Sequence, residues 1–129
     1  MTYKELNNLV FAIQNVSGDQ ETKIQKKLYK VYEKVKKTYE DYLEQVEELR
    51  LDNALTDEKG GLVLNEQGKY RFSKEGLKKL NKDISELNEK EFSFTKIPVV
   101  NPQGLEEFTF LKDWLSGVEF KEEEAEEEL

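Results

Sequence analysis

The chain contains no cysteine and no histidine among its 129 residues. Without cysteine there is no disulfide, no thiolate metal ligand and no cysteine nucleophile. Without histidine, the commonest general acid–base and the commonest metal ligand are also missing. These two absences remove most of the usual catalytic repertoire. The sequence therefore predicts a protein that is not an enzyme and needs no metal, cofactor or small-molecule substrate.

Long apolar runs are missing as well. No stretch approaches the roughly 18 apolar residues of a membrane-spanning helix. The first residues, MTYKELNN, lack the basic and then apolar pattern of a signal peptide. We therefore expect an intracellular protein without a membrane partner, and the length allows one domain with one modest core.

Acidic charge is concentrated near one end of the sequence. The net charge is −8, and residues 119–129 alone carry seven glutamates and one lysine, a net charge of −6. Such a segment cannot bury enough apolar surface to offset the entropy of ordering it. Residues 119–129 are therefore predicted to form a disordered acidic tail. The preferred interpretation is a solubilising tail, and a charged mimic or docking arm is the alternative.

Two helices are predicted in the first part of the chain. Thr2 and Glu5 form a capping-box pattern at the start of the first, and residues 16–20 break it, with Ser17 or Asp19 available to cap the next. The second helix runs from Gln20 to Asp52 without a glycine or proline. Apolar residues recur at helical spacing in both helices; they are Leu6, Leu9, Val10, Ile13, Ile24, Leu28, Val31, Val35, Tyr39, Tyr42, Val46 and Leu49.

A β-hairpin is predicted at about residues 61–72. Asn65 begins the turn NEQG and Gly68 takes its left-handed position, with apolar residues at the strand period on both sides. Ser73 is placed to cap a third helix carrying leucines and an isoleucine at helical spacing. The structural residues of this hairpin and its exit are Asn65, Gly68, Tyr70, Phe72 and Ser73, and the helix stripe is Leu77, Leu80, Ile84 and Leu87.

The last elements are an extended segment and a short helix. Residues 91–100 read as extended, with Pro98 at an edge or a strand end. Residues 105–116 place Phe108, Leu111, Trp114 and Leu115 at helical spacing, and Gly117 is the expected C-terminal cap. Aromatic residues at this spacing are more often core than a binding anchor.

Together these elements predict a mainly α fold. A long central helix is packed by two shorter antiparallel helices, with a small β-hairpin corner and a short C-terminal helix. The expected organisation is a single helical domain over residues 1–118 followed by the acidic tail.

The long helix reverses its charge along its length. Residues 21–37 carry a net charge of +5 and residues 38–52 a net charge of −5. The order opposes the helix dipole, so helix stability does not explain it, whereas pairing with another element does. An antiparallel homodimer, or a complementary helix of another protein, would match the two halves. The candidate protein-interface residues are Lys26, Lys30, Lys34, Glu40, Glu44, Glu47, Tyr29, Tyr32 and Leu43.

Two other interpretations of the lysine-rich face remain open. In the first interpretation, the lysine-rich face is a nucleic-acid surface. Because this face carries no arginine and the acidic tail would repel phosphates, nucleic acid is the less favoured partner. In the other it is an ordinary solvated face, as charge runs on helices usually are.

One part of the sequence resembles a known group of proteins. It consists of Asn65, Gly68, Lys69, Tyr70, Phe72, Ser73, Glu75 and Gly76, followed by LKKLNKDISELNEKE over residues 77–91. This stretch is similar to a hairpin-to-helix pattern in small proteins encoded among the morphogenesis genes of tailed bacteriophages and prophages. The order of elements over residues 1–116 is similar too. The function of these proteins is largely unassigned, and the resemblance carries no catalytic residues.

The resemblance implies a non-enzymatic phage structural or virion-assembly accessory protein that acts through protein–protein contacts. Its location would be the host cytoplasm during infection, or the virion. Its partner would be a second copy of the chain or another phage protein. One alternative is a small acidic phage protein that binds and inhibits a host factor, using residues 119–129 to imitate nucleic acid. A nucleic-acid-binding module is the other.

Overall fold

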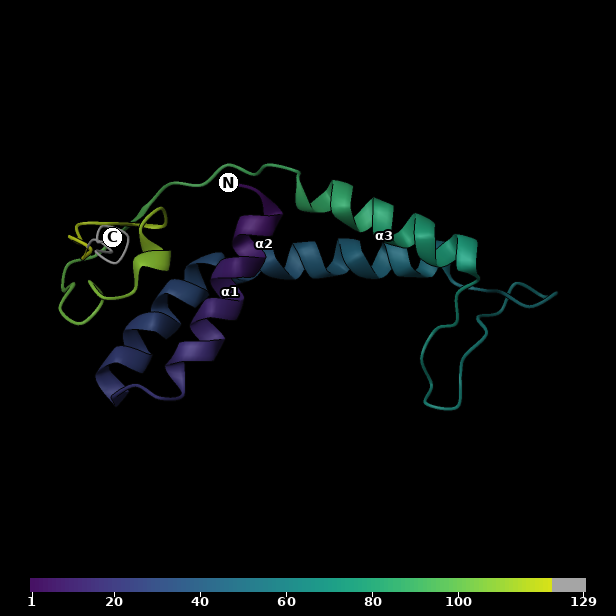
Figure 1. Ribbon diagram of the computed structural model, residues 1–129, viewed down its shortest axis with the longest axis horizontal. Coiled ribbons are helices and arrows are strands. Elements are labelled where there is room, and N and C mark those ends of the chain that lie inside the picture. The colour runs from purple at the N-terminus through teal and green to yellow at the C-terminus, as the bar shows by residue number, and fades with distance from the viewer. Residues whose placement is uncertain (122–129) are drawn as a thin grey trace, which may run out of the picture. The chain divides into compact units, whose positions relative to one another are not determined.

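The computed structural model describes residues 1–121. This part of the chain is mainly helical, as predicted, with three α-helices (Figure 1). It also contains a small parallel sheet. Of the predicted tail at 119–129, residues 122–129 lie outside the described residues. The elements in chain order are α1 (Tyr3–Ser17), α2 (Thr22–Asn53), α3 (Lys74–Asn88), β1 (Ile97–Pro98), a 3-10 turn (Thr109–Leu111) and β2 (Leu115–Ser116).

Contacts within the chain define two compact units. Unit 1 contains Met1, Glu5–Lys37 and the described chain from Ser93 onward, and unit 2 contains Thr2–Lys4 and Thr38–Phe92. Helix α2 gives its first half to unit 1 and its second half to unit 2. The single domain expected over residues 1–118 stays a prediction.

Unit 1 is built around the first half of α2, with α1 packed along it. Glu21 precedes α2, and its carbonyl accepts from the backbone N–H groups of Ile24 and Gln25, both at 2.9 Å. Neither Ser17 nor Asp19 therefore caps this helix, because it begins at Thr22. The apolar stripes predicted for this region are buried; their fully or nearly fully buried members are Leu6, Leu9, Val10, Ile13, Leu28, Val31 and Val35.

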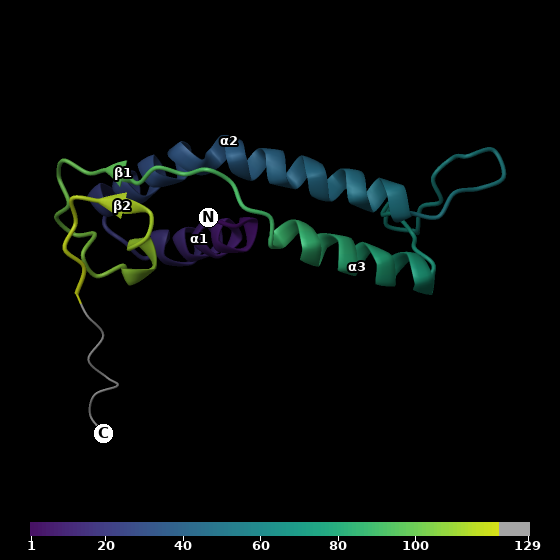
Figure 2. The same cartoon turned by 90° about the horizontal axis from the view of Figure 1, so that it is seen from above.

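The prediction of a short helix over residues 105–116 is wrong. Only a 3-10 turn forms there, and Leu115–Ser116 is strand β2, which pairs in parallel with β1 (Figure 2). The backbone N–H of Ile97 donates to the carbonyl of Trp114 at 2.9 Å. Pairing with a distant segment satisfies backbone groups that a helix would otherwise have bonded locally. Gly117, expected as a helix cap, instead follows β2 with a φ of +84°.

Three of the four apolar residues predicted in this C-terminal region are nevertheless buried, and the fourth, Phe108, is half-buried. Trp114 is only 4% exposed and its ring meets that of Phe94 edge-on, with centroids 4.8 Å apart. Leu105, Leu111 and Leu115 are also buried. Helical spacing thus identified most of the buried residues and predicted the wrong backbone conformation.

Unit 2 pairs the second half of α2 with α3, and the two run antiparallel. Tyr42 Oη donates to Asn88 Oδ1 at 2.7 Å, and Asn53 Nδ2 donates to Asp83 Oδ2 at 3.4 Å. The predicted cap is present, because Ser73 Oγ accepts from the backbone N–H three residues later at 2.9 Å. Leu80 and Leu87 are buried and Leu77, from the same predicted stripe, is exposed.

Two turns of identical construction follow one another between α2 and α3. In each, a side-chain oxygen accepts backbone N–H groups from two and four residues later, and a glycine three residues later has a positive φ. The first turn uses Asp57 and Gly60 (φ +83°), and the second uses Asn65 and Gly68 (φ +76°). The second is the turn that the sequence predicted at NEQG. The first was not predicted.

A closed ring of three backbone hydrogen bonds joins the two turns. Leu55 N–H donates to the Arg71 carbonyl at 2.7 Å, Arg71 N–H to the Val63 carbonyl at 3.1 Å, and Val63 N–H to the Leu55 carbonyl at 3.0 Å. Ladder pairing is limited to isolated antiparallel bridges, Thr56 with Leu62 and Leu64 with Tyr70. The predicted hairpin is thus one half of a double turn, held by a ring and not by a ladder.

Candidate protein interface

The nine predicted interface residues are divided between the two units. Five lie on the first half of α2, in unit 1, and four on the second half, in unit 2. The unit 1 residues are Lys26, Tyr29, Lys30, Tyr32 and Lys34; the unit 2 residues are Glu40, Leu43, Glu44 and Glu47.

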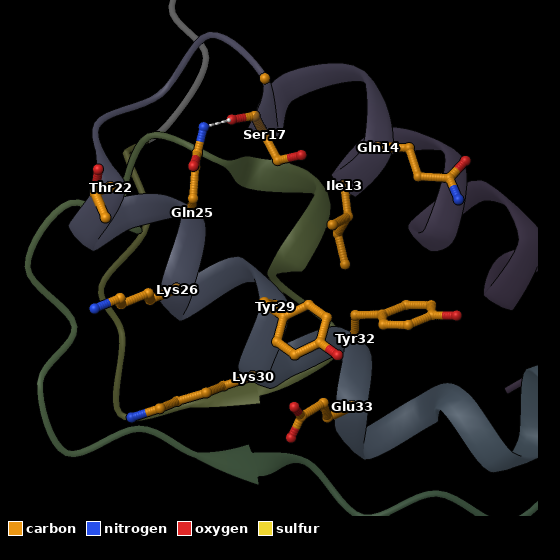
Figure 3. A pocket seen from close by; sticks show the side chains of 11 residues that line it. Ile13, Gln14, Ser17, Thr22, Gln25, Lys26, Tyr29, Lys30, Tyr32 and Glu33 are labelled. Atoms are coloured by element: carbon orange, nitrogen blue, oxygen red, sulfur yellow. Dashed lines mark hydrogen bonds between the residues drawn. The ribbon is translucent and has the colours of Figure 1, made fainter.

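The structure brings four of the unit 1 residues to one groove, between the end of α1 and the start of α2 (Figure 3). The groove has a volume of about 840 Å³. Gln25 Nε2 donates to the Ser17 carbonyl at 2.7 Å and so ties the two helices together beside it. The predicted residues in its lining are Lys26, Tyr29, Lys30 and Tyr32, and the others are Ile13, Gln14, Ser17, Gly18, Thr22, Gln25 and Glu33.

Two tyrosines give this groove its apolar surface. The rings of Tyr29 and Tyr32 lie on α2 with their centroids 6.2 Å apart, and Tyr29 is 55% exposed (Figure 3). Lys26 and Lys30 lie along α2 on the side of Tyr29 away from Tyr32. An exposed tyrosine offers a rigid apolar ring and a polar tip, which is the combination enriched at protein interfaces.

The lysine face of α2 is only partly solvated. Lys27 Nζ donates to the carbonyl of Gln103, so this lysine is held by the segment after β1. Lys30 and Lys34 are exposed, and with Lys27 they line a second, smaller groove of about 340 Å³. The face therefore carries exposed ammonium groups, while the aliphatic parts of its lysine side chains line a groove formed with another segment of the same chain.

The acidic residues on the second half of α2 differ in their availability. Glu47 is half-buried, and its Oε2 accepts a hydrogen bond from Tyr70 Oη at 2.6 Å. Glu40 and Glu44 are exposed, and Leu43 beside them is 45% exposed. Glu47 is thus engaged within unit 2, which leaves Glu40 and Glu44 as the exposed carboxylates of the predicted set.

Clusters of metal ligands and helices able to cross a membrane are both absent from the described part of the chain. Among residues 1–121, no three carboxylate, imidazole or thiol side chains come together as a metal site would require. None of the described helices is both long enough and apolar enough to cross a membrane.

The comparisons with known proteins give no assignment. Neither a protein family, nor a curated protein, nor a solved structure matches this chain significantly.

Sequence reasoning found the α2 side of the groove and missed the α1 side. Tyr29 and Tyr32 stand out because they flank the buried stripe of an amphipathic helix. Ile13, Gln14 and Ser17 carry no such signal, since their place in the groove depends on how α1 meets α2. No residue pattern within either helix encodes that approach.

Proposed function

We propose that this chain is a non-enzymatic accessory protein that acts by binding another protein chain during virion assembly in a tailed bacteriophage. The observation that carries the proposal is Tyr29, which is more than half exposed and lines a groove together with Tyr32. The viral setting comes from the resemblance of the hairpin and the third helix to proteins encoded among phage morphogenesis genes.

The groove suits a protein partner for physical reasons. An exposed tyrosine that becomes buried supplies a large contact area at a small cost in conformational entropy, and tyrosines are frequent among residues that dominate binding energy. Exposed ion pairs contribute only about 0.2–1 kcal/mol each. The tyrosines would therefore supply affinity, while Lys26 and Lys30 would select an acidic partner and set its orientation.

A second copy of the same chain is the partner we propose. The second half of α2 presents Glu40 and Glu44 to solvent, with Leu43 between them. In an antiparallel arrangement of two α2 helices, each basic half would meet an acidic half of the other chain, and the twofold axis would make both contacts equivalent. A complementary helix of another viral protein is the competing partner.

Light scattering of the purified chain at low and high salt tests the proposal. We expect a dimer whose dissociation constant rises as salt screens the charges. Reversing Lys26, Lys30 and Lys34 to glutamate should weaken the dimer, and adding Glu40→Lys and Glu44→Lys should restore it. Glu47 is left unchanged because it binds Tyr70.

A matched control changes the same charge elsewhere. Lys74, Lys78 and Lys82 of α3 are exposed, and their reversal to glutamate gives the same net charge. This variant should dimerise like the wild type. A chain that stays monomeric at every concentration and salt would rule out self-association and direct the search to a different viral chain.

A further inference from the structure

The smaller groove beside the lysine face has an apolar floor and a basic rim. It lies between α2 and the segment after β1, with Val31, Val99 and Leu105 among its lining residues. Lys27, Lys30 and Lys34 line it from α2. Val100 lies in the same lining and is 98% exposed, so apolar surface here is left uncovered by the described chain.

None of the three rim lysines forms an ion pair with an acidic residue among residues 1–121. The ion pairs within that range are Lys79 with Asp83 and Lys121 with Glu107. Lys27 is bound to the Gln103 carbonyl, which leaves Lys30 and Lys34 free to meet an anion. A groove of this kind is suited to an acidic peptide that also carries apolar side chains.

One acidic residue beside this groove, Glu106, is already engaged within its own loop. Glu106 Oε2 accepts from the backbone N–H of Gly104 at 2.8 Å. The backbone N–H of Glu106 itself, then that of Gly104, and then the charges of Lys121 and Lys27 hold the pKa of this carboxyl below its ordinary value. Glu106 is thus a stable anion committed to its own loop.

An acidic segment begins next to the same loop. Lys121 N–H donates to the Glu106 carbonyl at 3.0 Å, and Lys121 Nζ pairs with Glu107 Oε1 at 2.9 Å. The chain therefore leaves the described region beside Glu106, whose neighbour Leu105 lines the groove. The eight residues that follow, EEEAEEEL, hold six glutamates, Ala125 and Leu129. At about 3.3 Å per residue they can reach about 26 Å.

We propose that residues 122–129 bind in this groove of their own chain. Glutamates of the segment pair with Lys30 and Lys34, and Ala125 or Leu129 covers apolar surface at Val99 and Val100. Tethering gives the segment an effective concentration in the millimolar range, so weak individual contacts suffice and a free acidic ligand competes poorly.

Occupation of the groove would have a regulatory consequence. Lys30 and Lys34 are also residues of the proposed dimer interface, so the bound segment would compete with the acidic half of a second copy. This consequence rests on the proposed function, whereas the intramolecular contact does not.

Zero-length carbodiimide cross-linking of the full chain, followed by mass spectrometry, tests the contact. We expect glutamates 122–128 to be joined to Lys30 and Lys34. Exposed lysines elsewhere, such as Lys59 and Lys78, are the internal controls. Cross-links spread evenly over all exposed lysines, or absent at Lys30 and Lys34, would overturn the proposal.

Isotope mixing identifies the chain to which the segment binds. In an equal mixture of 14N- and 15N-labelled protein, an intramolecular contact gives only cross-linked peptides of one label. Mixed-label cross-links at Lys30 or Lys34 would show that the segment reaches a second copy and would overturn the intramolecular proposal.

Two further variants separate this proposal from the proposed function. Truncation after Lys121, and replacement of all six glutamates by glutamine, should both shift the amide resonances of Val31, Val99 and Val100. Both should also strengthen self-association by about threefold to tenfold, since a few exposed ion pairs compete for the same lysines. Cross-links with no self-association would support the segment contact and refute the dimer. Self-association without cross-links would do the reverse.

Discussion

Tyr70 Oη donates a hydrogen bond to Glu47 Oε2 at 2.6 Å, and the Arg50 guanidinium lies 5.5 Å from the centre of the same ring. These two contacts join the second of the two loop turns to the second half of α2. The contacting residues Glu47 and Arg50 lie about one helical turn apart on α2. Tyr70, which was predicted to be a structural residue of the hairpin, therefore engages Glu47, one of the carboxylates predicted at the interface.

The Tyr70–Glu47 contact predicts an alkaline pH dependence of stability. The hydrogen bond to Glu47, followed by burial and the negative charge of Glu47, raises the pKa of Tyr70 above its ordinary value of 10.0, and Arg50 opposes this to a smaller extent. The folded state therefore holds the proton more tightly than the unfolded state. The resulting stabilisation is complete well below pH 10 and is lost as the pH rises through and above 10.

Urea denaturation at a series of pH values from 8 to 11 measures this effect. Because phenylalanine has no proton to lose, Tyr70→Phe should show a smaller fall in the free energy of unfolding over this range than the wild type. Equal slopes for the two proteins would mean that the bond to Glu47 does not persist in solution.

The repeated turn geometry predicts equal sensitivity at two glycines. Gly60 and Gly68 both have positive φ, and a Cβ at either position would meet no atom within 4 Å. Backbone strain alone therefore decides the outcome, and valine at either site should cost about 1–3 kcal/mol. Gly68→Asn should cost much less because asparagine tolerates the left-handed region, and Gln67→Ala should be close to neutral. Chemical denaturation followed by circular dichroism gives these values, and a neutral Gly68→Val would contradict the assigned turn.

Local patterns predicted the helices well because a helix is a local structure. The stretch without glycine or proline from Gln20 to Asp52 appears as Thr22–Asn53, and the Ser73 cap is where the sequence placed it. The first turn was within reach of the same reasoning, since DEKG at residues 57–60 repeats NEQG at 65–68 eight residues earlier. It was missed because only the second was flanked by alternating apolar residues on both sides.

The errors lie where distant segments decide the conformation. Phe108, Leu111 and Trp114 have helical spacing, but their backbone follows a 3-10 turn and a strand that pairs with β1. That pairing spans about 18 residues, and no periodicity within residues 105–116 encodes it. The α1 side of the groove at Tyr29 was missed for a similar reason, since its place in the lining follows from tertiary packing.

Gly76 presents the opposite situation to the turn glycines. It lies in the first turn of α3, where alanine is the better helix former by about 1 kcal/mol. A Cβ there would lie 2.8 Å from the Asn53 carbonyl oxygen and 3.1 Å from Ser73 Oγ. The end of α2 thus approaches α3 as closely as it does only because residue 76 has no side chain.

Gly76→Ala should therefore destabilise the protein despite its gain in helix propensity. The helices must separate or the cap must shift, and overpacking of this kind typically costs about 1–3 kcal/mol. Gly18→Ala is the matched control, because a Cβ at Gly18 meets nothing within 4 Å; it should be neutral or slightly stabilising. Thermal denaturation of the two variants decides the matter, and equal midpoints would show that α2 and α3 do not approach this closely.

Trp114 provides a spectroscopic test of the corrected C-terminal region. It is the only tryptophan, it is buried, and Phe94 meets its ring edge-on at 4.8 Å. Phe94→Leu keeps apolar bulk but removes the aromatic pair, so it should lower the free energy of unfolding by about 0.5–1.5 kcal/mol. Phe94→Ala should cost more and shift tryptophan emission to longer wavelength, because water gains access to the indole. Phe11→Leu on α1 is the control, since Phe11 is 60% exposed and its replacement should change neither quantity. If the emission of Phe94→Ala matched that of the wild type, Phe94 would not cover Trp114, and the packing of the extended segment against β2 would have to be revised.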